Sequence, residues 1–117
     1  VSEKRDMYNV ITAWHNRQFA YMLGKMKSID EGNGTLLENS MLLYGSSLGD
    51  GHAHGEENLP VVFAGGGGGT IKNGRFLKYR KNYSLSKYHL ATMQRMGVGV
   101  EEFVDAESPM SGLTKDV

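Results

Sequence analysis

The chain has 117 residues, in which thirteen Lys and Arg balance thirteen Asp and Glu, and it contains no cysteine. This length suits one domain or a portion of a larger one. Zero net charge gives no long-range attraction to nucleic acid or to an anionic membrane, so we expect neither partner. The lack of cysteine excludes disulfides, Cys-ligated zinc and thiol nucleophiles. No apolar run approaches the roughly 20 residues of a transmembrane helix, and the first residues lack the apolar region of a signal peptide.

Residues 3–29 are predicted to form one long helix. Apolar side chains recur at steps of three and four residues, which makes an apolar stripe. The stripe consists of Met7, Val10, Ile11, Trp14, Met22, Met26 and Ile29. A helix of this length spans about 40 Å at ~1.5 Å per residue, so we expect it to lie across a larger body. The Gly- and Asn-containing residues 30–35 that follow predict a turn.

Two short apolar runs, 40–46 and 59–65, are predicted strands. Both are continuous rather than alternating, which is typical of central strands in a sheet that helices cover on both faces. The predicted unit is therefore strand, polar loop, strand over residues 40–65.

The second half of the chain has three further predicted elements. Asn73 and Gly74 are a two-residue hairpin signal, so residues 70–80 are predicted to form a hairpin. Residues 84–96 form an amphipathic helix, with Ser84 as its cap and Gly97 as its stop. Residues 97–117 are interpreted as loop and tail. The whole chain, 1–117, is thus expected to be one partial α/β domain, whose missing strands come from elsewhere in a longer chain or from a partner.

The polar loop between the two predicted strands has the side chains of a metal site. Carboxylate and imidazole groups suit Zn, Mn, Fe, Mg or Ca. The candidate ligands are Asp50, His52, His54 and Glu56, with Glu57 beside them. The spacing Asp50-x-x-x-His54 is compatible with two ligands to one ion, and so is His52-x-His54 in an extended segment. The alternative is an ordinary solvated loop.

The glycine run Gly65–Gly69 raises the question of phosphate binding, since glycine lets backbone N–H groups approach an anion. However, Thr70, Ile71 and Lys72 follow it, which matches neither the P-loop nor the dinucleotide-binding fingerprint. We therefore expect no nucleotide cofactor and a tightly packed or flexible turn. His15 and His89 lie in the predicted helices, where a structural or surface role is the default.

The stretch LLENSMLLYGSSLGDGHAHGEENLPVVFAGGGGGTIKNGRFLKY, residues 36–79, carries most of a set of spaced motifs that continues to Asp105. They are Asp50-Gly51 with His54, Asn58-Leu59-Pro60, Ala64-Gly65-Gly66, Lys72 with Gly74-Arg75, Met96-Gly97-Val98, and Phe103 with Asp105. In this combination the chain resembles the C-terminal part of the bacterial HXXSHH-motif proteins, a domain of unknown function. The resemblance covers nearly the whole chain.

That family is similar to the alkaline phosphatase and sulfatase superfamily. The resemblance implies the C-terminal portion of a three-layer α/β/α domain, incomplete on its own, in a periplasmic or extracellular protein. It implies Asp50 and His54 as the first metal ligands, Asn58 as a support of the loop, and Gly65 and Gly66 packed beside the site. A bound metal would act as a Lewis acid on a phosphate or sulfate oxygen, or activate water.

Two departures from the family pattern bear on activity. Glu56 stands where the family often has a second histidine, and the signature His-x-x-Ser-His-His is expected upstream of Val1. The catalytic residues are therefore unknown, and this chain alone is not expected to be a complete enzyme. The first hypothesis is the metal-binding C-terminal portion of a hydrolase of phosphate or sulfate esters. The alternative is a non-catalytic structural portion whose helix 3–29 docks to the remainder of its own chain or to a partner subunit.

Overall fold

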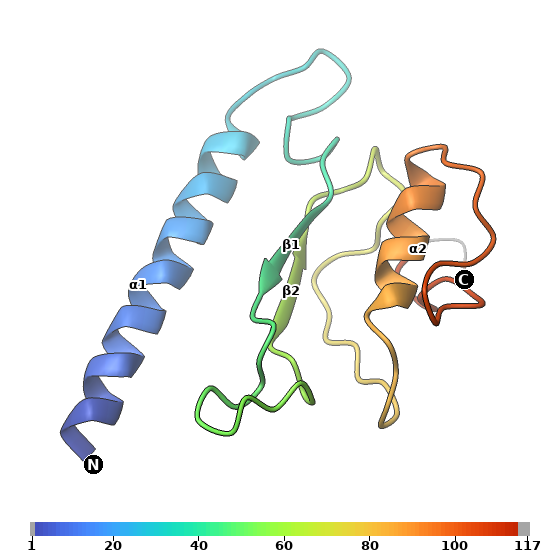
Figure 1. Ribbon diagram of the computed structural model, residues 1–117. Coiled ribbons are helices and arrows are strands. Elements are labelled where there is room, and N and C mark those ends of the chain that lie inside the picture. Colours follow the sequence, from blue (N-terminus) through green and yellow to red (C-terminus); the bar gives the residue numbers. More distant parts are fainter. Residues whose placement is uncertain (1, 115–117) are drawn as a thin grey trace.

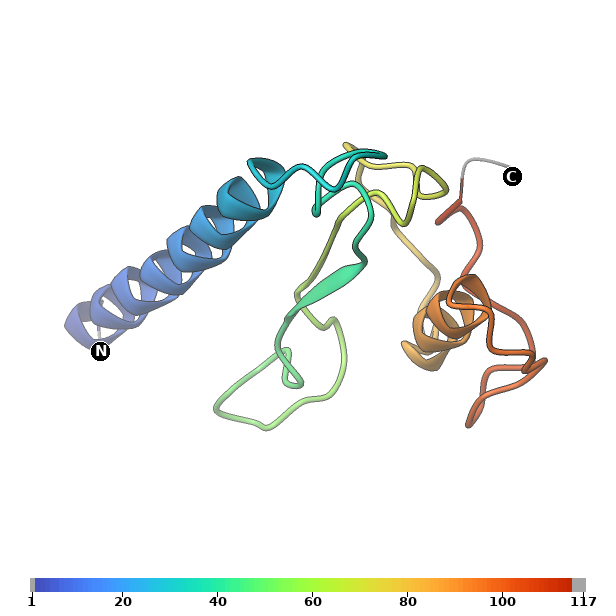
Figure 2. The same cartoon turned by 90° about the horizontal axis from the view of Figure 1, so that it is seen from above.

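The computed structural model describes residues 2–114, which form two helices and a two-stranded antiparallel sheet. In chain order the elements are α1 (Ser2–Lys27), β1 (Leu42–Gly45), β2 (Val61–Ala64) and α2 (Ser86–Arg95). Figure 1 and Figure 2 show the sheet between the two helices. The chain therefore combines helices and strands in an α/β arrangement, as the order of apolar patterns predicted. Neither described helix is long and apolar enough to cross a membrane.

The two strands pair directly with each other, and the polar loop folds back between them. Residues that pair across an antiparallel ladder place their side chains on the same face of the sheet. The register therefore puts Leu42, Tyr44, Val62 and Ala64 on one face and Leu43, Val61 and Phe63 on the other.

Each face of the sheet meets one helix through an aromatic pair. On one face, Tyr44 stacks on Phe19 of α1 with ring centroids 4.4 Å apart, and its hydroxyl donates to Asn16 Oδ1 at 3.1 Å. On the other face, Phe63 stacks on Tyr88 of α2 at 4.2 Å. The helices thus flank the sheet on both sides, as continuous apolar runs favour. Neither strand is a central strand in the described residues, however, because the sheet has only two strands.

The hydrophobic core lies on the α2 side of the sheet. Its buried members come from the start of the segment after the glycine run, from α2 and from the end of the described chain. They are Ile71, Tyr88, Ala91, Met110 and Leu113, and Phe63, Tyr79 and Tyr83 are among the half-buried residues that pack against them. The predicted tail is therefore not loose, because Met110 and Leu113 belong to the core, and the Met110 amide donates to the Lys87 carbonyl at 2.8 Å.

The helices begin and end close to the predicted residues. The prediction of Ser84 as the cap is wrong, because Leu85 is the N-cap of α2 and makes no side-chain cap bond. Ser84 Oγ instead accepts a hydrogen bond from the Ser86 amide at 3.1 Å and donates to Asp105 at 2.8 Å, just before the helix. At the other end, Gly97 has a φ of 81°. Its amide donates to Gln94, and the Val98 amide donates to Met93, at 3.1 and 3.0 Å. These two bonds are a Schellman ending, so the prediction of Gly97 as the helix stop is confirmed.

The predicted hairpin at residues 70–80 is wrong. No strand forms between Thr70 and Arg80; Ile71 instead bridges to Thr114. Gly74 does adopt a positive φ of 74°, but the Asn73 side chain donates to the Gly65 carbonyl at 2.9 Å. The Asn-Gly pair therefore anchors the segment to the glycine turn and does not reverse it into a second strand.

The molecule is more extended than a compact domain of its length. Its radius of gyration is 16.3 Å, whereas a compact domain of this length has about 13 Å. Its accessible surface is 8867 Å², and a folded monomer of this mass exposes about 6,300 Å². The surplus surface is large, and α1 has no buried residue.

Candidate functional site

The predicted ligand residues lie in the loop that joins β1 to β2, beyond one end of the hairpin. Two backbone hydrogen bonds close the tip of this loop. The Gly49 amide donates to the Gly55 carbonyl at 2.8 Å, and the Gly55 amide donates to the Asp50 carbonyl at 3.1 Å. The residues from Asp50 to Gly55 therefore form a compact turn and not an open arc.

The Asp50 carboxylate organises this turn. Its Oδ1 accepts the backbone N–H of His52 at 2.8 Å and that of Ala53 at 2.9 Å. This is the local side-chain-to-backbone bonding by which aspartate favours turns. The Ala53 amide, followed by the His52 amide, holds the pKa of the Asp50 carboxyl below its ordinary value, because both bonds favour the charged form. Asp50 is thus an exposed carboxylate that remains ionised at neutral pH.

Three other acidic or imidazole side chains share a hollow with Asp50. They are His54, Glu56 and Glu57, and Gly49, Gly55 and Asn58 complete the lining. His52 does not line it. His54 and Asn58 both have a φ of 53°, a left-handed backbone conformation that asparagine tolerates better than histidine. The loop therefore turns sharply at two points, and it brings three of the four predicted ligands to one hollow.

The donor chemistry of the hollow suits a hard or borderline divalent cation. Within residues 2–114, however, no three His, Asp or Glu side chains converge closely enough to hold a metal ion. One oxygen of Asp50 is also already bonded to two amides. A metal held here by Asp50 and His54 needs either a rearrangement of Glu56 and Glu57 or a further ligand from outside the described residues.

The glycine turn, residues 65–69, lies at the opposite end of the β1–β2 strand pair from the polar loop. Gly65 follows Ala64, the partner of Leu42, whereas the polar loop joins Gly45 to Val61. This corrects the expectation that Gly65 and Gly66 pack beside the polar loop.

The glycine turn packs instead on residues 37–40. The amides of Gly66, Gly67 and Gly68 donate to the carbonyls of Leu37, Ser40 and Glu38, at 3.0, 3.0 and 2.9 Å. A side chain at Gly65 would collide with the Ser40 carbonyl, and one at Gly66 with that of Glu38. The glycines are therefore needed for close backbone approach, and these three N–H groups, which a phosphate would require, already have partners.

Two features that the sequence interpretation missed matter for function. The first is charge segregation: residues 28–71 contain six Asp and Glu but no Lys or Arg, and residues 72–100 contain seven Lys and Arg but no Asp or Glu. The balanced total concealed this pattern, although a count in windows detects it. The second is that α1 has two apolar faces. The half-buried Phe19, Leu23 and Met26 lie on a different side of the helix from the exposed Met7, Ile11 and Trp14.

Comparisons of this chain with protein-family models, with curated proteins and with solved structures gave no match.

Proposed function

We propose that this chain is the docking portion of a larger assembly and that α1 is the element that docks. The observation that carries this proposal is that α1, 26 residues long, buries none of its side chains and exposes a row of large apolar ones. At 100° per residue, six of these lie along one face of the helix. They are Met7, Val10, Ile11, Trp14, Tyr21 and Met22, which we call the outer stripe.

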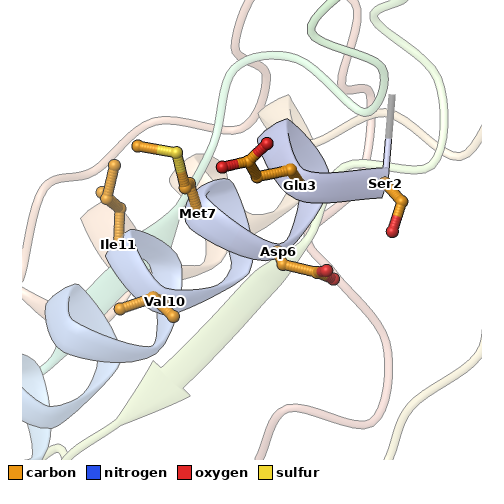
Figure 3. Close-up of a pocket in the computed structure, with 6 residues that line it drawn as sticks. All are labelled: Ser2, Glu3, Asp6, Met7, Val10 and Ile11. Carbon is orange, nitrogen blue, oxygen red and sulfur yellow. The ribbon is translucent and has the colours of Figure 1, made fainter.

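The outer stripe faces away from the rest of the fold. The other side of α1 carries the contact with the sheet, where Phe19 stacks on Tyr44. Figure 3 shows the first turns of the helix, where Met7, Val10 and Ile11 form a shallow hollow with Ser2, Glu3 and Asp6. All six residues belong to α1. Trp14, the only tryptophan of the chain, is 54% exposed in the middle of the stripe.

The amount of exposed surface supports docking. A contiguous apolar patch on an otherwise polar molecule is typical of an interaction site. The molecule exposes 8867 Å², roughly 2,500 Å² more than a folded monomer of its mass. That surplus falls in the size range of permanent interfaces. The docking partner in this proposal is the remainder of the same polypeptide or a partner subunit.

Site-specific photocrosslinking in the native cell tests this proposal. A photoreactive amino acid at Ile11 or Trp14 is expected to give one defined crosslink, either to another chain or to a distant part of the same chain. The matched control is Asn9, an exposed polar residue of α1 outside the stripe. Crosslinks of equal yield and identity from Asn9, or none from Ile11 and Trp14, would overturn the proposal.

The polar loop supports a second candidate function. The resemblance to the HXXSHH-motif family implies the metal-binding C-terminal portion of a secreted hydrolase of phosphate or sulfate esters. What favours this candidate is the hollow that Asp50, His54, Glu56 and Glu57 share. In such a site Asp50 and His54 would hold a divalent metal, which would supply Lewis acidity, and Glu56 would supply a further oxygen.

Elemental analysis after equilibration with Zn²⁺ or Mn²⁺ tests the second candidate. Stoichiometric metal is expected in the longest native form of the protein, and it is expected to be lost in Asp50→Ala and His54→Ala. His15→Ala is the control, because His15 is an exposed histidine of α1 that lies outside the loop. Metal that persists in both loop variants, or that is lost equally in His15→Ala, contradicts a site at Asp50 and His54.

A further inference from the structure

The outer stripe of α1 has an opposite charge at each of its two ends. At the N-terminal end, Glu3 lines the shallow hollow with Met7 and Val10, and Figure 3 shows the Glu3 side chain beside that of Met7. At the C-terminal end, Lys25 Nζ lies 5.4 Å from the ring centroid of Tyr21. At 100° per residue, both charged residues fall within the sector of the helix surface that the outer stripe occupies. The stripe is thus an apolar row with a carboxylate at one end and an ammonium group at the other.

These two charges are placed symmetrically about Trp14. Glu3 is eleven residues before Trp14, and Lys25 is eleven residues after it. Two copies of α1 that run antiparallel and cross at Trp14 therefore bring Glu3 of each copy level with Lys25 of the other. Such a pair has a two-fold axis, and a two-fold interface requires a surface that is complementary to itself. The outer stripe, with its two end charges, meets this requirement.

The end charges also determine the direction in which two helices pair. A parallel pair would place Glu3 beside Glu3 of the other copy, and Lys25 beside Lys25. Charges that flank the apolar seam between two helices set partner choice and orientation, and like charges are unfavourable there. The antiparallel arrangement replaces both repulsive contacts with ion pairs, so the charges favour it.

The rest of the fold leaves the outer stripe accessible to a second copy. The half-buried Phe19 and Leu23 lie on the other side of α1, and Figures 1 and 2 show the sheet and α2 on the same side of that helix. Two copies can therefore pair through their outer stripes while their sheets lie on the outside of the pair. Each partner of a standard interface contributes about 800 Å². The molecule exposes 8867 Å², a surplus of roughly 2,500 Å² that exceeds this contribution.

We propose that the partner of the outer stripe is a second copy of this chain, paired antiparallel through α1 with Trp14 at the centre and two Glu3–Lys25 ion pairs at the ends. This inference rests on the proposed docking function of α1 and names its partner. Trp14 anchors the interface, because tryptophans near the centre of an interface commonly carry much of the binding energy. The ion pairs lie at the rim, where they set direction and register more than affinity.

Charge reversal tests the pairing, with sedimentation equilibrium of the intact chain as the measurement. The unaltered chain is expected to form a dimer. Glu3→Lys and Lys25→Glu are each expected to weaken that dimer by about tenfold, since both end pairs become like charges. The double variant Glu3→Lys/Lys25→Glu is expected to restore it, because opposite charges face each other again. The control is Arg5→Glu, which makes the same change in net charge as Lys25→Glu on the opposite side of α1 and is expected to leave the dimer unchanged.

Introduced cysteines test the antiparallel direction, because the chain has no cysteine of its own. In an antiparallel pair centred on Trp14, Met7 of one copy lies level with Tyr21 of the other. A mixture of Met7→Cys chains and Tyr21→Cys chains is therefore expected to form a mixed disulfide under mild oxidation. Each variant alone is expected to form far less disulfide. Disulfides mainly between identical variants would indicate parallel helices and would overturn the proposal.

The failure of this proposal can be distinguished from the failure of the proposed docking function. A monomeric intact chain, with crosslinks from Ile11 and Trp14 that lead to a different chain or to another part of the same chain, overturns self-pairing and leaves docking by α1 in place. The absence of any defined crosslink from these two positions overturns both. A dimer that both single charge reversals leave intact, or that the double variant fails to restore, also overturns pairing through Glu3 and Lys25.

Discussion

Asp50 is the residue on which the geometry of the polar loop depends most. Its carboxylate bonds to two amides and lies in the hollow with His54, so one side chain shapes the loop and supplies its ionised oxygen. A carboxylate that accepts backbone N–H bonds is stabilised in its charged form. The structural role of Asp50 and its proposed ligand role therefore require the same protonation state.

The lowered pKa of Asp50 makes the order of the loop depend on pH. The stabilisation is present above the ordinary pKa of an aspartate and is lost as pH falls through the lowered value in the folded chain. Titration of the Asp50 carboxyl carbon by NMR is expected to give a pKa below the ordinary value. In Asp50→Ala the amides of His52 and Ala53 are expected to exchange faster with solvent at neutral pH, whereas Asp50→Asn retains part of their protection. An ordinary pKa at Asp50 would contradict the two hydrogen bonds.

Gly65 is the residue where a single methyl group is expected to do most harm. Its φ of 100° disfavours other residues, and an added Cβ meets the Ser40 carbonyl. Gly65→Ala is therefore expected to lower the free energy of unfolding by ~2 kcal/mol or more. Gly51→Ala is the matched control, since nothing lies within 4 Å of its added Cβ. Chemical denaturation compares the two, and an equal effect would refute close packing at the glycine turn.

At the scale of single elements, α1 is attached to the sheet near its C-terminal half and is otherwise free. Phe19 and Asn16 contact Tyr44, and the Met26 carbonyl accepts the Leu37 amide at 3.3 Å. An isolated helix of up to about 15 residues is only marginally stable in water, and the part of α1 that precedes Asn16 is of about this length. If the docking proposal is correct, the first half of α1 gains stability from the partner that covers the outer stripe.

Phe19→Ala is expected to release α1 from the sheet. The stacked pair with Tyr44 is lost, so amide exchange along α1 is expected to accelerate while the amides of α2 keep their rates. Exchange measured by NMR tests this, with Gln18→Ala as a control on the exposed side of the same turn. Faster exchange in α2 as well would indicate that α1 and the core unfold as one unit.

The helices and strands were predictable from local pattern, but their pairing was not. Periodic apolar residues identified α1, and Gly97 carried the signal for the C-terminal end of α2. Asn73-Gly74 misled because its outcome depends on a distant carbonyl, that of Gly65, which no local pattern reveals. The loop residues were assigned to one site because they are close in sequence. The structure instead uses the His52 amide to bond Asp50, and the His52 side chain does not line the hollow.

At the scale of the whole molecule, the described chain is a small core with two poorly covered extensions, α1 and the polar loop. The core depends on contacts between segments far apart in sequence, such as Ile71 with Leu113. Its radius of gyration of 16.3 Å and its large exposed area fit a molecule that completes its packing by association.

Leu113 tests whether the C-terminal segment belongs to the core. Its side chain is 2% exposed, so Leu113→Ala is expected to reduce the free energy of unfolding by ~2–4 kcal/mol. Val104→Ala is the control, because Val104 is 85% exposed, and its effect is expected to stay within ~0.5 kcal/mol. Thermal or denaturant unfolding followed by circular dichroism measures both. A small effect at Leu113 would mean that the segment after α2 does not stabilise the fold.

The charge segregation along the chain is expected to give the molecule an electric dipole. Opposite charges gathered in separate segments create an electric dipole even when their sum is zero. Such a molecule turns in the field of a charged neighbour before contact, with residues 72–100 leading toward an anionic surface. Near its pI of about 7.1, it is expected to be retained by a cation exchanger at low ionic strength and released as salt shortens the Debye length.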